Sequence, residues 1–138
     1  MSRYLLDTNH VGVAVDATTD LAVRITESQR RGNRVGTCLP VLCEIPAGRM
    51  QVSHPQEYQR DLDGLLKQIR IWPMDEETTE IYGRLHALLR RRGRVLSAVD
   101  LMAAALAEQH GFTILTTDRD FEAIHDVVSV ENWLAQSK

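Results

Sequence analysis

Residues 2–11, SRYLLDTNHV, place a short apolar run directly before an acid. Tyr4, Leu5 and Leu6 are typical of a buried strand, because strands that are covered on both faces are apolar throughout. Asp7 then follows, with no charged residue in the next two positions. A carboxylate at the end of a buried strand needs a partner or a function, since an isolated charge beside the core is costly.

Similar short strands recur along the chain and alternate with amphipathic helices. We expect strands at 4–6, 34–38, 69–73 and 112–117, and a last apolar piece at 127–134. We expect a helical turn at 11–15, helices at 21–31, 40–50 and 55–70, one after Asp75, one at 98–110, and a turn after Asp120. This alternation predicts a three-layer α/β/α fold with a mostly parallel central sheet, formed as a single domain of residues 1–138.

Polar residues and prolines predict several helix ends. Asp20, Asp75 and Ser97 are suitable N-caps, because their side chains can accept hydrogen bonds from backbone N–H groups of the first turn. Pro40 suits the first position of a helix, where its missing N–H costs nothing. Pro46 lies inside the same segment and should kink or shorten that helix.

The composition is that of a soluble globular protein: of 138 residues, 43% are hydrophobic and 25% are charged. The net charge of −3 argues against a general affinity for nucleic acids. No apolar run approaches the roughly 20 residues of a membrane helix, and the first residues are not typical of a signal peptide. We therefore expect a cytoplasmic protein without a membrane partner. Cys38 and Cys43 lack the spacing of a zinc site and are expected to be reduced and partly buried.

Four acids are placed to meet at one edge of the predicted sheet. Asp7 ends the first strand, and Asp118 follows the strand at 112–117. Glu44 comes soon after the second strand, and Asp100 lies in the first turn of the helix before the last strong strand. Ligands of such sheets bind beyond the carboxyl ends of the strands. Converging carboxylates repel one another unless a hard cation such as Mg²⁺ or Mn²⁺ lies between them.

Each acid also has an ordinary structural interpretation. Asp7 suits a turn or a helix cap, and Asp100 completes a capping box with Ser97. Glu44 fits a solvated helix face, and Asp118 fits the start of a turn. It is the joint placement of the four acids at one sheet edge that favours a site.

Four blocks of sequence, in this order and size, resemble the PIN domain, and within it the VapC-type toxins of bacterial toxin–antitoxin pairs. They are LLDTN at 5–9, EIPAG at 44–48, SAVDLMAAALA at 97–107 and ILTTDRDF at 114–121, and VENWL at 130–134 is also similar. The resemblance spans nearly the whole chain. It implies a metal-dependent ribonuclease that acts on RNA, has a cognate antitoxin as partner and forms a homodimer.

The resemblance also implies roles for individual residues. One or two Mg²⁺ or Mn²⁺ ions would be surrounded by Asp7, Glu44, Asp100 and Asp118. Supporting positions near this site would be Thr8, Asn9 and Thr116. Asp120 is a fifth candidate acid, with the cap of a helix at Phe121 as its alternative. Pro46 departs from the family's pattern and puts the aim of Glu44 in doubt.

Arginine supplies nearly all of the positive charge, because only Lys67 and Lys138 are lysines among 16 basic residues. The densest basic run is Arg90, Arg91, Arg92 and Arg94, and a second cluster is Arg30, Arg31 and Arg34. Guanidinium groups suit phosphate recognition, so the first run is a candidate for guiding RNA. The alternative is that these arginines only favour a helix C-terminus and keep the surface soluble.

Three rival functions share some of these features. A phosphoacceptor receiver domain has a similar length and an acidic pocket, but it needs a lysine soon after the last strand, and none follows FTILTT closely. A haloacid-dehalogenase-type phosphatase needs a second Asp where Asn9 stands. A non-catalytic RNA-binding module would carry fewer acids near a phosphate chain.

An antitoxin would have to neutralise the acids and hold the surface around them. An Arg or Lys of the partner suits the acidic site, and an apolar groove suits the rest of an extended segment. The segments VGVAV at 11–15 and LPVLCEI at 39–45 are candidates for lining that groove, with ordinary core as the alternative.

Overall fold

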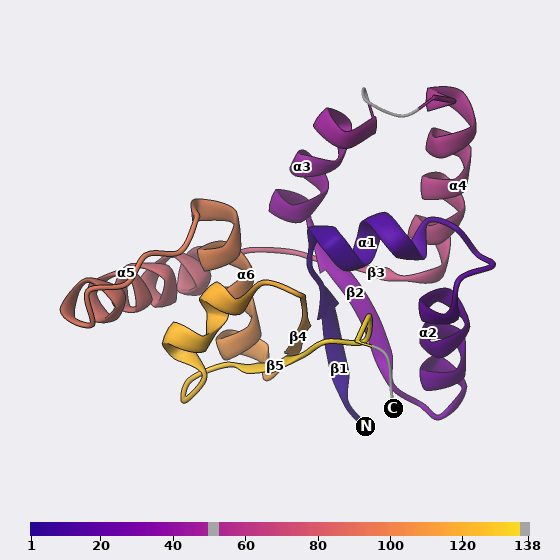
Figure 1. The fold of residues 1–138 in the computed structure, drawn as a ribbon. Helices are drawn as coiled ribbons and strands as arrows, with labels where there is room; N and C mark the ends of the chain where they lie inside the picture. The colour runs from indigo at the N-terminus through magenta and orange to yellow at the C-terminus, as the bar shows by residue number, and fades with distance from the viewer. Residues whose placement is uncertain (50–52, 136–138) are drawn as a thin grey trace.

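The computed structural model describes residues 1–49 and 53–135 and is built around a five-stranded parallel sheet (Figure 1). The strands are β1 (Arg3–Leu6), β2 (Arg34–Cys38), β3 (Arg70–Trp72), β4 (Thr113–Leu115) and β5 (Ser129–Glu131). Their order across the sheet is β3-β2-β1-β4-β5, which differs from the 2-1-3-4-5 order of receiver domains. The predicted three-layer fold is confirmed, and the chain does not have a receiver's sheet.

Helices connect the strands and cover the sheet. They are α1 (Thr8–Ala14), α2 (Asp20–Arg30), α3 (Leu39–Arg49), α4 (Pro55–Gln68), α5 (Glu76–Arg91), α6 (Ala98–His110) and the 3₁₀ helix η1 (Arg119–Ile124). In Figure 1, α5 and α6 lie on one side of the sheet, and α2 and α4 lie on the other. Within residues 1–49 and 53–135, no helix has the length and apolar character needed to cross a membrane.

The core is formed where these helices meet the sheet. Leu5, Leu6, Ile114 and Leu115 of the two central strands are fully buried, as the apolar runs predict. On α5, the predicted apolar face is confirmed, since Ile81, Leu85 and Leu89 are buried and Leu88 is half-buried. Cys38 and Cys43 are free thiols as expected, and Cys38 is buried. Cys43 is exposed, so the expectation that it is partly buried was wrong.

Helix α1 is longer than the predicted turn at 11–15. It begins at Thr8, because the Asp7 side chain accepts the Thr8 N–H at 2.8 Å and the Asp7 carbonyl oxygen accepts the N–H groups of His10 and Val11. Thr, Asn and Gly are weak helix formers, so the segment from Thr8 carries little helical signal of its own. The hydrogen bonds of Asp7, at the end of β1, stabilise the first turn of α1 despite these weak helix propensities.

Predicted caps were correct where one candidate stood alone and wrong where two polar residues were adjacent. Asp75 caps α5 in a capping box with Thr78, and Ser97 caps α6. The cap of α2 is Thr19, whose hydroxyl accepts the Ala22 N–H at 3.2 Å, and not Asp20. Asp20 is instead the first residue of α2, where a negative charge favours the helix dipole.

Pro46 was expected to kink or shorten α3. The helix continues through Pro46 to Arg49, so the shortening does not occur. Burial of Val41 and Ile45 in the core favours the helix and offsets the backbone hydrogen bond that Pro46 cannot make. The side chain of Pro46 and all of Met50, the last residue of the predicted segment, lie outside the described part of the chain.

Candidate active site

The pairing of β1 with β4 places two polar residues side by side at the carboxyl edge of the sheet. Leu6 lies opposite Leu115 in the register, so Asp7 and Thr116 are the next residues of the two strands. The Asp7 N–H donates to the Leu115 carbonyl oxygen at 2.9 Å, and the Thr116 hydroxyl donates to Oδ2 of Asp7 at 2.7 Å. The Asp7 carboxylate is therefore held in a fixed position at this edge of the sheet.

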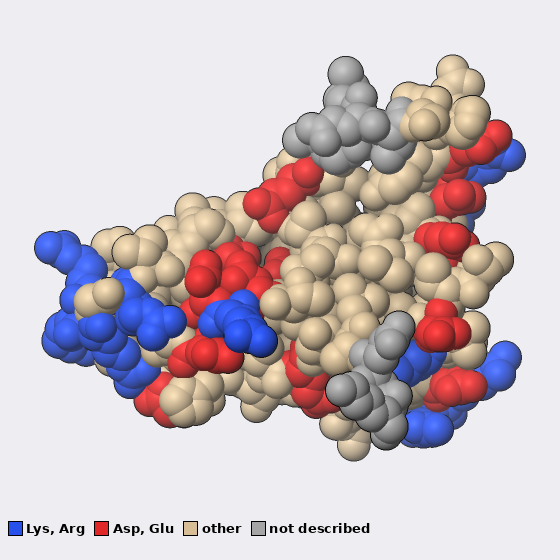
Figure 2. Space-filling model, in the orientation of Figure 1, with Lys and Arg blue, Asp and Glu red and all other residues tan. Residues whose placement is uncertain are grey.

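All four predicted acids line one hollow at this edge. The hollow has a volume of about 370 Å³ and is lined by Asp7, Thr8, Asn9, Glu44, Ser97, Asp100 and Asp118. Glu44 comes from α3, Asp100 from the first turn of α6, and Asp118 from the residue before η1. Figure 2 shows acidic side chains gathered near the middle of the visible face. Parts of the chain that are far apart in sequence thus bring their carboxylates together.

Asp7 is both a helix cap and a member of this hollow. Its Oδ1 accepts the Thr8 N–H, its Oδ2 accepts the Thr116 hydroxyl, and the residue is only 3% exposed. Burial raises the pKa of Asp7, the two hydrogen bonds oppose this rise, and the nearby charges of Glu44 and Asp118 add to it. The capping interpretation of Asp7 and the site interpretation are therefore compatible.

The environment of the hollow strongly shifts the pKa of the Asp100 carboxyl group. Its backbone N–H donates to Oγ of Ser97 at 3.1 Å, so the residue also belongs to the cap of α6. Burial and then the charge of Asp7 raise the pKa of Asp100 to about 7, although a hydrogen bond with Ser97 opposes the rise. A carboxyl group with this pKa is about half protonated at neutral pH unless a cation takes the place of the proton.

Glu44 and Asp118 are held by neighbouring hydroxyl and amide groups. The Thr8 hydroxyl donates to Oε1 of Glu44. The Asp118 N–H donates to Oγ1 of Thr116 at 3.0 Å, and Oδ1 of Asp118 accepts the Asp120 N–H at 2.8 Å. Asp118 is therefore the cap of η1, and the alternative that Asp120 caps this helix was wrong. Asp120 is exposed and is not among the described residues that line the hollow.

The chemistry of this donor set fits a divalent cation. Carboxylate oxygens are the ligands that Mg²⁺ and Mn²⁺ prefer. Burial, and to a smaller extent repulsion by the other acids, raises the pKa values of Asp7 and Asp100, and a cation would offset both effects. In the described ranges, no three His, Cys, Asp or Glu side chains are already arranged to hold a metal ion. Mg²⁺ commonly keeps several water ligands and uses one or two carboxylates, so the hollow fits an ion that is held partly through water.

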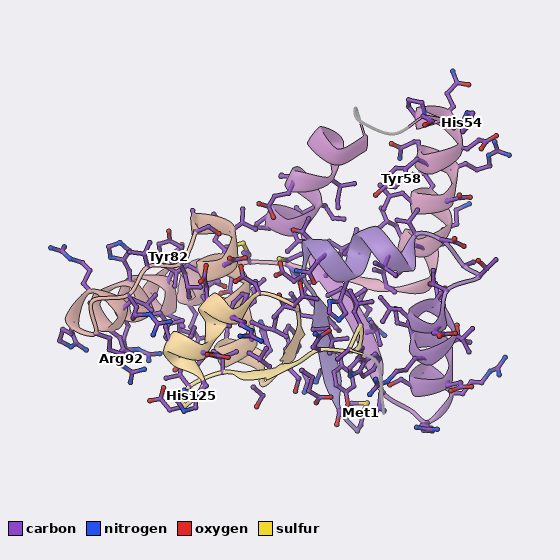
Figure 3. The ribbon with its side chains drawn as sticks, viewed as in Figure 1. Met1, His54, Tyr58, Tyr82, Arg92 and His125 are labelled. Atoms are coloured by element: carbon purple, nitrogen blue, oxygen red, sulfur yellow. The ribbon has the colours of Figure 1, made fainter. Side chains whose placement is uncertain are left out.

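The arginine run predicted to guide RNA divides into two parts. The Arg92 guanidinium donates to both carboxylate oxygens of Asp126 at 2.8 Å and to the Ala123 carbonyl oxygen. These bonds connect the end of α5 to η1 and the residues that follow it. Figure 3 labels Arg92 and, near it, His125. The other members of the run are exposed: Arg90, Arg91 and Arg94. Arg92 therefore has a structural partner, which sequence spacing did not indicate.

Sequence reasoning missed His10, which contacts Asn9 of the hollow, and Trp133, which contacts His10 in turn. His10 is fully buried, and its ring lies 2.7 Å from the side-chain oxygen of Asn9 and 3.1 Å from the Trp133 N–H. The two residues are 123 positions apart, so no local spacing connects them. The only available signals were their positions, directly after DTN and within VENWL.

Comparison with known proteins points to one family. The PIN domain family model matches residues 4–127. "Ribonuclease VapC4" of Mycobacterium tuberculosis is 32% identical over 91% of this chain and 93% of its own length. "Ribonuclease VapC2" of Rickettsia felis is 27% identical over 94% of this chain and 97% of its own. The crystal structure of VapBC2 from Rickettsia felis, bound to a DNA fragment from its promoter, matches with a TM-score of 0.83 and 26% identity over 95% of this chain and 98% of that chain.

Replacing Asp100 by Asn should stabilise the metal-free protein above pH 7. The pKa of Asp100 is raised from 3.8 to about 7 on folding, so the folded state binds more protons between these values and stability falls as the pH rises through this range. An Asn side chain does not ionise and so avoids this loss. We expect the free energy of unfolding to rise by about 1 kcal/mol at pH 8, which is less than the pKa shift alone would give because the side chain is partly exposed. Urea unfolding in EDTA at pH 5 and pH 8 measures the difference, which should shrink at pH 5.

The matched control is Asp61→Asn, which changes an exposed acid of α4 outside the hollow. It should alter stability little at either pH. A loss of stability in Asp100→Asn at both pH values would contradict the account and leave Asp100 as part of the α6 cap alone.

Proposed function

The chain belongs to the PIN-domain family, and from this premise we propose that it is a ribonuclease that hydrolyses RNA phosphodiester bonds with the help of a divalent metal ion. The observation that carries the proposal is the hollow lined by four carboxylates at the carboxyl edge of the sheet. It is supported by relatives that are named ribonucleases and are similar over nearly their whole length.

One or two Mg²⁺ or Mn²⁺ ions would be held by Asp7, Glu44, Asp100 and Asp118. Such an ion supplies Lewis acidity toward phosphate oxygens and lowers the pKa of a water molecule. The protein's own contribution is to hold the carboxylates still. The Thr8 N–H and the Thr116 hydroxyl fix the two oxygens of Asp7, and the Thr8 hydroxyl orients Glu44.

We expect water to attack the phosphate directly, without a covalent intermediate on the protein. The two threonine hydroxyls beside the hollow are engaged as donors, from Thr8 to Glu44 and from Thr116 to Asp7. His10, the nearest histidine in sequence, bonds to Asn9 and to the Trp133 N–H. These contacts stabilise the carboxylates and their support, and they do not activate a hydroxyl as a nucleophile.

An RNA chain must approach an acidic hollow, so positive charge is needed beside it. Arg90, Arg91 and Arg94 are exposed at the end of α5 and in the loop that follows, and Figure 2 shows basic side chains gathered at this end of the molecule. We propose that these three arginines contact RNA phosphates and position the chain without reading its sequence.

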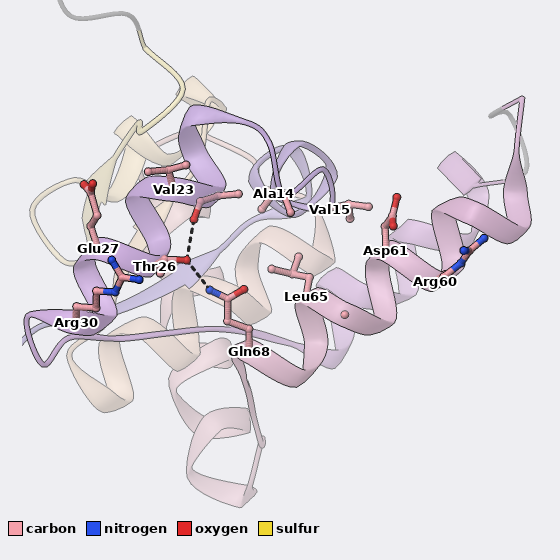
Figure 4. Close-up of a pocket in the computed structure, with 13 residues that line it drawn as sticks. Ala14, Val15, Val23, Thr26, Glu27, Arg30, Arg60, Asp61, Leu65 and Gln68 are labelled. Atoms are coloured by element: carbon pink, nitrogen blue, oxygen red, sulfur yellow. Dashed lines mark hydrogen bonds between the residues drawn. The ribbon is translucent and has the colours of Figure 1, made fainter.

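We also propose that the protein is the toxin of a toxin–antitoxin pair, in keeping with its likeness to the VapC ribonucleases and to VapBC2. A groove of about 540 Å³ between α2 and α4 offers a site for the antitoxin (Figure 4). Val15 and Leu65 lie buried in the groove, and Glu27, Arg30 and Asp61 carry charges around it. An apolar floor with a charged rim suits an amphipathic segment of a partner.

The groove and the acidic hollow lie at opposite ends of α1. Asp7 and Thr8 at its start line the hollow, whereas Ala14 and Val15 at its end line the groove. A helix of seven residues is about 10 Å long, which an extended segment of a few residues spans. One antitoxin segment could therefore fill the groove with apolar side chains and place an Arg or Lys against the acids.

The two segments predicted to line the groove have different outcomes. At the end of VGVAV, Ala14 and Val15 line the proposed groove and are also part of the core. Val11, and Val41 and Ile45 of LPVLCEI, belong to the core, so for them the ordinary alternative was correct.

The purified protein should cut RNA in Mg²⁺ or Mn²⁺ and stop doing so in EDTA. Asp7→Asn, Asp100→Asn and Asp118→Asn keep the volume of the side chain but remove its charge, and each should lower the cleavage rate at least about 100-fold, a loss of roughly 3 kcal/mol of transition-state stabilisation. Single-turnover cleavage of a labelled RNA measures the rates, and circular dichroism checks the fold of each variant.

Glu80→Gln, at an exposed acid of α5 that lines neither the hollow nor the groove, serves as the control and should cleave like the unchanged protein. Cleavage that persists undiminished in EDTA, or that survives all three Asn substitutions, would rule out this mechanism.

Binding of the antitoxin should depend on the groove and not on the hollow alone. Val23 lies in the groove and is 49% exposed, so Val23→Asp adds a charge without disturbing the core. It should weaken the complex at least about 10-fold, because an apolar contact is replaced by a desolvated charge, while RNA cleavage by the free protein stays the same. Val95→Asp, at a residue that is 83% exposed and outside the groove, is the matched control. Equal antitoxin affinity of the two variants would exclude the groove as the docking site.

A further inference from the structure

The side chain of Asn9 is held by its neighbour His10 and by two residues that follow β4. Its side-chain oxygen accepts the Thr117 N–H at 3.2 Å and lies 2.7 Å from Nδ1 of His10. Its side-chain nitrogen donates to Oγ1 of Thr116 at 3.3 Å. On the far side of the His10 ring, Nε2 lies 3.1 Å from the Trp133 N–H. These contacts form one continuous chain from Trp133 to the hollow.

The two backbone N–H groups at the ends of this chain decide where the protons lie. Because a backbone N–H can only donate, the Asn9 atom beside Thr117 must be its carbonyl oxygen. That oxygen cannot donate, so Nδ1 of His10 must carry the proton that lies between them. Nε2 is then free of a proton and accepts from Trp133. A single neutral tautomer of His10 satisfies every partner.

The chain continues from Asn9 into the carboxylates. A threonine hydroxyl has one proton and two lone pairs, and all three are used at Thr116. It donates to Oδ2 of Asp7 at 2.7 Å, and it accepts from Asn9 and from the Asp118 N–H at 3.0 Å. The placement of two acids of the hollow therefore depends on a hydroxyl whose direction Asn9 helps to fix.

The other end of the chain is anchored by packing. Trp133 is 8% exposed, its ring centroid lies 4.8 Å from that of Tyr4, and the Arg24 guanidinium lies 4.1 Å above its ring. The parallel pairing of β5 with β4 sets Glu131 opposite Leu115, so the residues after both strands reach the same edge of the sheet. Trp133 thus provides a fixed point for the ring of His10.

We propose that His10 is a positioning residue: by donating from Nδ1 to Asn9 while Trp133 holds its Nε2, it fixes the Asn9–Thr116 contact that places Asp7 and Asp118 for the metal ion. This inference rests on the proposed function, but the contacts that it names exist without substrate. It assigns a part in the active site to the VENWL segment, which lies outside the hollow.

Two substitutions separate the two bonds of His10. His10→Asn places an amide nitrogen near the position of Nδ1, so it can still donate to Asn9 but no longer reaches Trp133. His10→Gln places an amide oxygen near the position of Nε2, so it can still accept from Trp133 but leaves Asn9 without this donor. If His10 only fills space in the core, the two variants should differ in stability alone.

The test compares the variants in three measurements. We expect Mn²⁺ to bind His10→Gln roughly 10–100-fold more weakly than His10→Asn, as is usual when a group supporting metal ligands is lost. The cleavage rate kcat should fall in the same order with little change in KM. The Thr117 and Asp118 amides, which bond to Asn9 and Thr116, should exchange with solvent at least about 10-fold faster in His10→Gln. Equal Mn²⁺ affinity and equal amide exchange in the two variants would overturn the proposal.

The outcomes keep this inference apart from the proposed function. If the unchanged protein neither cleaves RNA nor binds Mn²⁺, the proposed function fails, and the amide exchange of Thr117 and Asp118 still decides the role of His10. If a variant does not fold, the nitrogen spectrum of the His10 ring in the unchanged protein decides it. A proton on Nδ1 supports the proposal, and a proton on Nε2 overturns it.

Discussion

The parallel pairing of β1 with β4 is the contact on which the rest of the site depends. With Leu6 opposite Leu115, Asp7 and Thr116 leave the sheet together and their side chains bond directly. The next pairing, of β4 with β5, brings Trp133 to the same edge. Parallel strands share one carboxyl edge, so residues from the start and the end of the chain meet there. A cluster of acids assembled in this way needs no local sequence motif longer than a few residues.

The acids of the hollow stabilise the fold through one set of contacts and destabilise it through another. Asp7 caps α1, and Asp118 caps η1, so each carboxylate satisfies a backbone N–H at the start of a helix. Gathering the charges in a partly buried hollow raises the pKa values of Asp7 and Asp100. Under the proposed function, a metal ion would offset this cost, and so would a basic side chain of an antitoxin. The same electrostatic cost would then favour both metal binding and inhibition.

Much of the fold followed from the sequence, because its strands are apolar throughout and its helices have clear faces and caps. Ile81, Leu85 and Leu89 identified the buried face of α5 in this way. Errors arose where two polar residues compete for one role: Thr19 and not Asp20 caps α2, and Asp118 and not Asp120 caps η1. Choosing between neighbours needs the backbone geometry, which residue type does not determine.

The candidate site was predictable for a different reason and to a smaller extent. The four acids could be identified as candidates because the predicted ends of strands and starts of helices indicated which side chains lie near the carboxyl edge of the sheet. The pairing of Arg92 with Asp126 and the contact of His10 with Trp133 depend on how distant segments pack, and they leave no periodic trace in the sequence.

The most direct test of the account is the location of Mn²⁺ by anomalous scattering in crystals of the protein, at a concentration that supports RNA cleavage. We expect a peak in the hollow, with the carboxylates of Asp7, Asp100 or Asp118 among the ligands of the ion and water completing the shell. A map in which Mn²⁺ binds elsewhere while the hollow holds no ion would contradict it.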